Sequence, residues 1–218
     1  MLRHPHTRVT EQTDERCGKE DFFNKDYMLA TFNFEIFPPV TIETRFYLFD
    51  LGASLYNKGA GGASMAWFVD TYEKRGIKFD RILAWEMTQH SPESIFQSFP
   101  KYPYEVMSYF NIPAVTGRED HVNPLNILKS ITKNLDFVVI KIDIDNEMVE
   151  EQFLQQILED DDISSRIDEL YFEHHVGKHP MEYPYWGDST PNPRQNITQS
   201  FQLFESLRKK GIRAHSWV

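Results

Sequence analysis

The most informative stretch of the sequence is Phe137-Val-Val-Ile-Lys-Ile142, which is followed directly by Asp143-Ile144-Asp145-Asn146. A short apolar run that breaks into acids is typical of a strand buried on both faces and ending at a polar edge of a sheet. Five further apolar runs, each followed by turn residues, have the same character: 46–51, 81–85, 106–110, 170–173 and 212–218. The sequence therefore predicts about six strands.

Amphipathic stretches lie between these runs. Ser91-Pro92 and Asn123-Pro124 each place an N-cap residue before a proline at the first helical position. Apolar residues recur at helical spacing in 149–158 and 197–207, and a further helix is expected over 63–75. Strands that alternate with helices predict an α/β fold, a doubly wound and mostly parallel sheet with helices on both faces. We expect this Rossmann-like domain to cover residues 41–218.

Composition and charge narrow the classes of partner. Acids outnumber Lys and Arg by 33 to 23, so the net charge is −10 and a nucleic-acid partner is not expected. The sequence has no apolar run of membrane-spanning length, so we expect a soluble chain. Cys17 is the single cysteine, which excludes an internal disulfide and a zinc site built on several thiolates. A cytoplasmic location is the default expectation, and a lumenal domain trimmed of an N-terminal anchor is the alternative.

Residues 1–40 are set apart from the regular pattern. They are charged, then aromatic-rich, and the segment closes at Pro38-Pro39. We expect an N-terminal arm that is packed on the domain or partly disordered.

Acids and glycines stand just past the first two predicted strands, where ligands bind in such sheets. Asp50, Gly52, Ala53 and Ser54 close the first strand, but the chain lacks the Gly-x-Gly-x-x-Gly arrangement that seats a pyrophosphate, which counts against NAD and FAD. Glu86 closes the second strand, where an acid can hold ribose hydroxyls. The alternatives are a glycine-rich turn without a ligand and a solvated strand-end acid.

The fourth predicted strand ends in two carboxylates. Lys141, Asp143 and Asp145 share one face if the strand continues that far. Paired carboxylates need a cation, a basic partner or a shared proton, so this pair is a candidate site. The alternative is that the acids cap the next helix.

His174 and His175 follow the fifth predicted strand and are candidates for a general base or a metal ligand. Since neighbouring strand residues point to opposite faces, at most one of them should reach the site of Asp143. A metal site would be formed by Asp143, Asp145 and His174. The aromatic segment 176–194 after them is long enough to be a lid over the cleft.

Together these segments resemble the FkbM-type branch of the S-adenosylmethionine-dependent methyltransferases. The resemblance is carried by four stretches, Phe49-Asp-Leu-Gly-Ala53, Ala84-Trp-Glu86, Tyr109-Phe-Asn111 and Val139-Ile-Lys-Ile-Asp-Ile-Asp-Asn146. The chain departs from the family in having Ser54-Leu-Tyr-Asn57 after the first motif and Asn146 in place of a glycine, and in ending on its sixth strand instead of adding a seventh.

The resemblance implies a cofactor, a reaction and a set of site residues. It implies that the protein binds S-adenosylmethionine and methylates a hydroxyl on a small-molecule or carbohydrate acceptor. The implied cofactor-binding residues are Asp50, Gly52, Ala53, Ser54, Glu86 and Asn111. The resemblance implies that Asp143 faces the transferred methyl group or the acceptor hydroxyl, and with the strand-end histidines the expected catalytic residues are Asp143, His174 and His175. A divalent metal is compatible with this assignment, but it is not expected to be required for cofactor binding.

Two other classes of function stay open. Asp143-Ile144-Asp145 with a downstream histidine could be the metal-binding Asp-x-Asp of a nucleotide-sugar glycosyltransferase. The chain could also be a non-catalytic binding module that retains the fold, since fold does not fix function.

Overall fold

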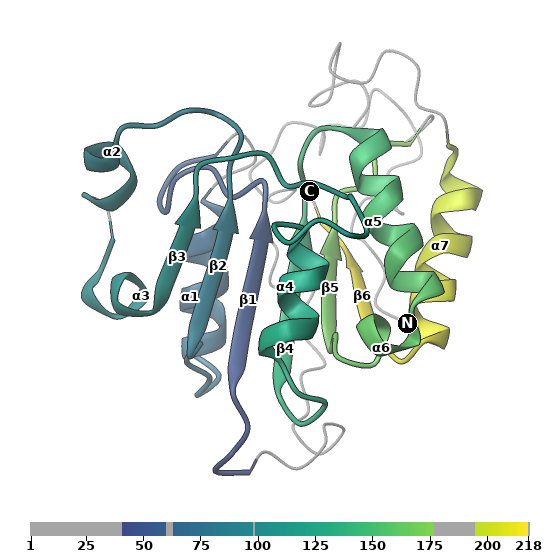
Figure 1. The fold of residues 1–218 in the computed structure, drawn as a ribbon, viewed down its shortest axis with the longest axis horizontal. Coiled ribbons are helices and arrows are strands. Elements are labelled where there is room, and N and C mark those ends of the chain that lie inside the picture. Colours follow the sequence, from purple (N-terminus) through teal and green to yellow (C-terminus); the bar gives the residue numbers. More distant parts are fainter. Residues whose placement is uncertain (1–40, 60–62, 98, 177–194, 218) are drawn as a thin grey trace, which may run out of the picture.

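The computed structural model describes residues 41–59, 63–97, 99–176 and 195–217. Its centre is a six-stranded sheet in the order β3-β2-β1-β4-β5-β6, and every pair of neighbouring strands is parallel (Figure 1). The strands are β1 Phe46–Leu51, β2 Arg81–Trp85, β3 Met107–Phe110, β4 Phe137–Ile142, β5 Glu169–Phe172 and β6 Arg213–Ser216. The predicted α/β class, with about six strands, is confirmed.

Helices cover both faces of the sheet, as predicted. They are α1 Ser64–Glu73, α2 Pro92–Phe96, α3 Lys101–Val106, α4 Pro124–Ile131, α5 Glu147–Glu159, α6 Asp161–Ser164 and α7 Ile197–Lys209. Helix α1 lies behind the sheet in Figure 1, whereas α4, α5 and α7 lie in front of it. The short helices α3 and α6 were not predicted from the sequence.

Each face of the sheet contributes to its own apolar cluster. On the α1 face, Phe68 and Tyr72 pack against strand residues such as Leu48 and Val139. On the opposite face, side chains of α4, α5 and α7 pack against the alternate strand residues, for example Phe49. Because β1 and β4 are covered on both sides, they read as continuous apolar runs and not as alternating ones.

The helix ends follow the expected local chemistry. The side chains of Ser91 and Asn123 accept backbone N–H groups at the starts of α2 and α4. Asn196 does the same for α7 within a capping box, and the helix is followed by Gly211 with φ +92°. These caps define where α2, α4 and α7 begin, and Gly211 marks the end of α7.

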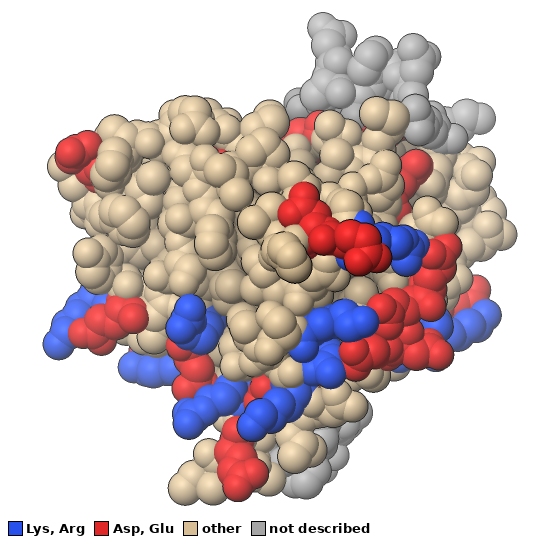
Figure 2. Space-filling model, viewed as in Figure 1, with Lys and Arg blue, Asp and Glu red and all other residues tan. Residues whose placement is uncertain are grey.

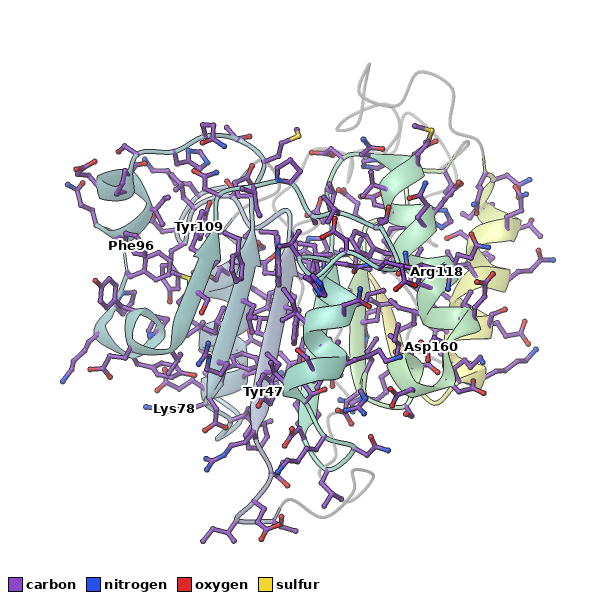
Figure 3. All side chains as sticks on the ribbon, viewed as in Figure 1. Tyr47, Lys78, Phe96, Tyr109, Arg118 and Asp160 are labelled. Atoms are coloured by element: carbon purple, nitrogen blue, oxygen red, sulfur yellow. The ribbon has the colours of Figure 1, made fainter. Side chains whose placement is uncertain are left out.

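Two ion pairs hold the front layer together. Arg118, in the segment between β3 and α4, pairs with Glu159 at the end of α5 (Figure 3). Asp160, between α5 and α6, pairs with Lys129 of α4 at 2.9 Å (Figure 3). The end of α5 is therefore joined by charged groups to α4 and to the segment before α4, as well as by the apolar cluster beneath them.

Two expectations fall on parts of the chain beyond this description. The predicted N-terminal arm, residues 1–40, lies outside the described residues, and so does most of the predicted lid, residues 177–194. Among the described residues, none of the helices combines the length and the apolar character needed to cross a membrane.

Candidate functional site

The candidate site lies at the carboxyl edge of the sheet, where β1 is flanked by β2 on one side and β4 on the other. The chain proceeds outward from β1 to β2 and β3 and then returns to β4, so this is the point where the strand order reverses. Ligands in open α/β sheets bind outside the strand ends at such a point. The predicted residues Gly52, Glu86, Asn111 and Asp143 all follow their strands directly.

Gly52 makes the turn at the end of β1. Its φ is +81°, a left-handed conformation that favours glycine, and a Cβ at this position would lie 1.7 Å from the carbonyl oxygen of Asp143. The N–H groups of Gly52 and Ala53 both donate to the carbonyl of Trp85 at 3.0 Å. The turn is therefore wedged between the ends of β2 and β4, and a glycine is required by this close approach.

Asp50 is fully buried and forms an ion pair with Lys141, which is also buried. The Lys141 Nζ lies 3.2 Å from Asp50 Oδ1 and donates to the carbonyl of Gly52 at 2.8 Å. Burial raises the pKa of Asp50 despite this partner. The Asp50 carboxylate is enclosed by the protein and contacts Lys141, so it acts on the sheet edge by positioning that ammonium group.

Lys141 links Asp50 to Asp143, which it meets at 3.1 Å. Burial alone would lower the pKa of this ammonium group, but the charges of Asp143 and Asp50 outweigh burial and raise it. Lys141 is therefore a permanent cation at the centre of the sheet edge.

Asp143 is the better exposed member of this group, with a side chain that is 22% exposed. Its Oδ2 also accepts the indole N–H of Trp217 at 3.1 Å. Burial favours its neutral form, but Lys141 and a hydrogen bond with Glu173 outweigh burial and lower the pKa of Asp143. Asp143 is therefore an ionised carboxylate held in a fixed position.

Glu86 organises the loop next to the Gly52 turn. Its two oxygens accept the N–H groups of Ser54 and Thr88, at 2.8 and 2.6 Å. A carboxylate has about four acceptor positions, so capacity for ligand hydroxyls is left. Glu86 therefore ties the ends of β1 and β2 together and keeps acceptor positions for the hydroxyls of a ligand.

Asn111 and Tyr109 extend this network from β3. The Asn111 amide donates to the carbonyls of Glu86 and Thr88 and accepts the N–H of His90 at 2.9 Å. The hydroxyl of Tyr109, near the upper end of β3 in Figure 3, donates to the carbonyl of Ser54 at 2.7 Å. Asn111 therefore shapes the loop that carries Glu86, and its side chain is already engaged by backbone groups.

The two histidines lie in different surroundings. The His174 ring nitrogen meets the hydroxyl of Ser200 in α7 at 3.0 Å, and burial lowers the pKa of His174 to about 4. His175 points the other way, toward Glu173 at 3.4 Å and Asp145 at 4.0 Å. Although burial favours the neutral ring, these acids raise the pKa of His175. His175, and not His174, belongs to the site of Asp143.

Asp145 does not continue the strand as the alternation argument assumed. Its φ is +58°, so the backbone turns after Asp143 and the two carboxylates do not share a simple strand face. The turn is held by Glu150, whose carboxylate accepts the N–H of Ile144 at 2.8 Å, while Asn146 caps α5. Asp145, Glu173 and His175 are thereby grouped, in place of Asp143, Asp145 and His174.

Sequence reasoning missed several members of this region. Glu150 is buried, and burial raises its pKa to about 7. Trp217 follows the sixth strand and reaches Asp143 across β5. The buried glutamate at an expected helix start and the indole at a strand end were visible in the sequence, but their partners depend on strand order, which a single sequence does not reveal.

A small pocket opens beside this group. It is lined by residues of α5, of the β5 end and of the start of α7, among them Glu147, Glu150, His174, His175 and Gln195.

Figure 2 shows acidic but no basic side chains on the upper edge of the described surface in that view. This edge suits a cationic or hydroxylated ligand better than a polyphosphate.

Comparison of the chain with models of protein families, with curated proteins and with solved structures gave no match. The assignment of a function therefore depends on the geometry of the site.

Proposed function

We propose that the protein is an S-adenosylmethionine-dependent methyltransferase that transfers a methyl group to a hydroxyl of a small-molecule or carbohydrate acceptor. The observation that carries the proposal is the placement of two acids, Glu86 and Asp143, on either side of the Gly52 turn at the point where the strand order reverses. The absence of a glycine-rich pyrophosphate motif from the sequence is consistent with a ligand without phosphate.

S-adenosylmethionine supplies a methyl group on a sulfonium cation, together with a ribose and no phosphate. Glu86 is placed to accept ribose hydroxyls while it holds the turn at Ser54. Asp143 is ionised beside the same turn and offers negative charge to a cationic ligand. Lys141 and Trp217 keep that carboxylate in place, so its orientation does not have to be established during binding.

The transfer needs an acceptor oxygen in line with the methyl carbon. The oxygen–carbon bond forms as the carbon–sulfur bond breaks, the sulfur keeps the electron pair, and the hydroxyl proton leaves to a base. Asp143, which is ionised and held by Lys141 and Trp217, is the group we assign to orient the hydroxyl and to take this proton.

The test is calorimetric titration of the full chain with S-adenosylmethionine in EDTA. Glu86→Gln should weaken binding by about tenfold or more, because a charged hydrogen bond is worth roughly 1.5–3 kcal/mol. Asp143→Asn should act in the same direction. Glu93→Gln, in the exposed first turn of α2, is the matched control and should bind like the parent.

The proposal fails if the parent does not bind S-adenosylmethionine, or if both site variants bind it as the parent does. Binding of a UDP-sugar that depends on Mn²⁺ would instead assign the glycosyltransferase reaction.

A further inference from the structure

A second group of side chains lies at the ends of β4 and β5, beyond Asp143. Asp145, Glu173 and His175 each offer one ligand atom, and these atoms lie within 4.8 Å of one another. The His175 Nε2 is 3.4 Å from Glu173 Oε2 and 4.0 Å from Asp145 Oδ1. A metal ion bonded at about 2.1 Å holds neighbouring ligand atoms roughly 3 to 3.5 Å apart. The Glu173–His175 distance already lies in this range, and the exposed Asp145 carboxylate would have to move closer to complete the triangle.

We propose that Asp145, Glu173 and His175 bind a divalent metal ion of the Mn²⁺ type. Two carboxylate oxygens favour a hard cation, and the imidazole shifts the preference from Mg²⁺ and Ca²⁺ toward a first-row transition ion.

The backbone brings the three ligands together from two strand ends. Glu173 and His175 are two residues apart in a segment that still continues the ladder, since the N–H of Glu173 donates to the carbonyl of Ile142 at 3.2 Å. Residues two apart in an extended chain share a face. Asp145 approaches from the neighbouring strand through its left-handed turn. The buried carboxylate of Glu150 anchors that turn at Ile144 and is a positioning residue for the site.

The ligands differ in exposure in a way that suits a site with open positions. The side chain of His175 is 2% exposed and that of Glu173 is 13% exposed, whereas that of Asp145 is 70% exposed. Two ligands are therefore fixed by the protein core, and the third faces solvent. Three protein ligands leave coordination positions for water or an oxygen of a bound molecule, as in catalytic metal sites.

Charge also favours a cation here. Asp143, Glu150 and Glu173 gather around His175, and the positive groups that act on these three acids are Lys141 and His175 itself. Lys141 is already engaged by Asp50 and Asp143. A divalent ion would neutralise carboxylates that otherwise repel one another.

The site has a role in the reaction that rests on the proposed function. Asp143 contacts the Gly52 turn through its backbone carbonyl and Glu173 through its carboxylate. It therefore links the proposed cofactor site to the proposed metal site. An acceptor hydroxyl bound to the ion would lie beside Asp143, and the ion would orient it and make it more acidic.

The test is titration of the full chain with Mn²⁺ in the absence of S-adenosylmethionine, with free Mn²⁺ followed by electron paramagnetic resonance. The parent should bind the ion, with Mg²⁺ competing weakly. Asp145→Asn and His175→Asn should each weaken binding by about tenfold or more, as loss of a ligand costs at least as much as loss of an outer partner.

Glu147→Gln and His174→Asn are matched controls, since both residues line the neighbouring pocket but are not in the ligand group, and both should bind Mn²⁺ like the parent. If His175→Asn does not fold by circular dichroism, the exposed Asp145→Asn variant decides. The proposal is overturned if the parent does not bind Mn²⁺, or if Asp145→Asn binds it as the parent does. Because no S-adenosylmethionine is present, failure of the methyltransferase assignment would leave this result intact.

Discussion

Gly52 shows how one residue sets the geometry of the strand ends. Its missing side chain allows the turn after β1 to approach the carbonyl of Asp143, while Lys141 donates to the Gly52 carbonyl from below. Gly76 shares the left-handed conformation, with φ +79°, but a Cβ there would meet nothing within 4 Å. Alanine variants of the two glycines can therefore be compared. Gly76 reports only the cost of a side chain in the left-handed conformation, whereas Gly52 adds the cost of a steric clash.

We expect Gly52→Ala to lower the free energy of unfolding by roughly 3 kcal/mol or more, because left-handed strain adds to a backbone collision. Gly76→Ala should cost only about 1 to 2 kcal/mol, the conformational part alone. Urea denaturation of both variants measures the difference. Equal losses would show that the close approach to Asp143 is relieved by a small shift of the turn.

The residue scale is also where the sequence was least informative. A glycine after the first strand and an acid pair after the fourth could be predicted, because turn and edge residues have recognisable chemistry. The burial of Asp50 could not be predicted, since its partner Lys141 belongs to a strand that is distant in the sequence. The turn at Asp145 was missed because the alternation of side chains holds only in an extended chain, and the backbone of Asp145 is left-handed, with φ +58°.

At the scale of elements, β1 and β4 are joined by a buried ion pair as well as by the backbone hydrogen bonds between the two strands. Asp50 and Lys141 are register partners, and the row continues through Tyr171 of β5 to His215 of β6. The row lies on the α1 face, where most neighbours are apolar. A buried ion pair in such surroundings is costly to break, because the remaining charge keeps its burial penalty.

Lys141→Met should therefore lower the free energy of unfolding by about 3 to 5 kcal/mol, since it leaves two carboxylates without their cation. The double variant with Asp50→Asn should lose less, because one of those buried charges is removed. Urea denaturation provides the comparison. Lys209→Met, which breaks an exposed pair with Glu205 in α7, is the control and should leave stability nearly unchanged. A loss as small as that of the control would mean that Lys141 contributes little as a counter-ion.

Most elements were predictable and two were not. Proline after a cap residue located the starts of α2 and α4, and apolar spacing located α5 and α7. The missed helices, α3 with six residues and α6 with four, are too short to show a repeating apolar face.

For the molecule as a whole, buried acids make stability depend on pH. Burial raises the pKa of Asp168, just before β5, to about 6, well above the ordinary range of an aspartate. Its carboxylate accepts the N–H of Val138 at 2.8 Å. The folded state thus holds this proton more tightly than the unfolded state, so the contribution of Asp168 to stability is present below pH 4 and is lost as pH rises toward 6.

Asp168→Asn removes this titration and keeps an oxygen that can accept the N–H of Val138. Relative to the parent, the variant should gain up to about 3 kcal/mol of unfolding free energy between pH 4 and pH 7. Denaturant titrations at both pH values measure this. Asp70→Asn, on the exposed side of α1, is the control and should follow the parent. A constant difference between variant and parent would show that Asp168 does not titrate in this range.

The strand order has a consequence for how the chain reaches its native state. β1 is flanked by β2 and β4, and the Asp50–Lys141 pair joins residues 91 positions apart. During synthesis, β1, β2 and β3 emerge before β4, the strand that pairs with the other edge of β1. The long chain segment between β1 and β4 must form a closed loop before β4 can pair with β1. We therefore expect slow folding with an early β1–β2–β3 intermediate whose open strand edge is prone to aggregation until β4 docks.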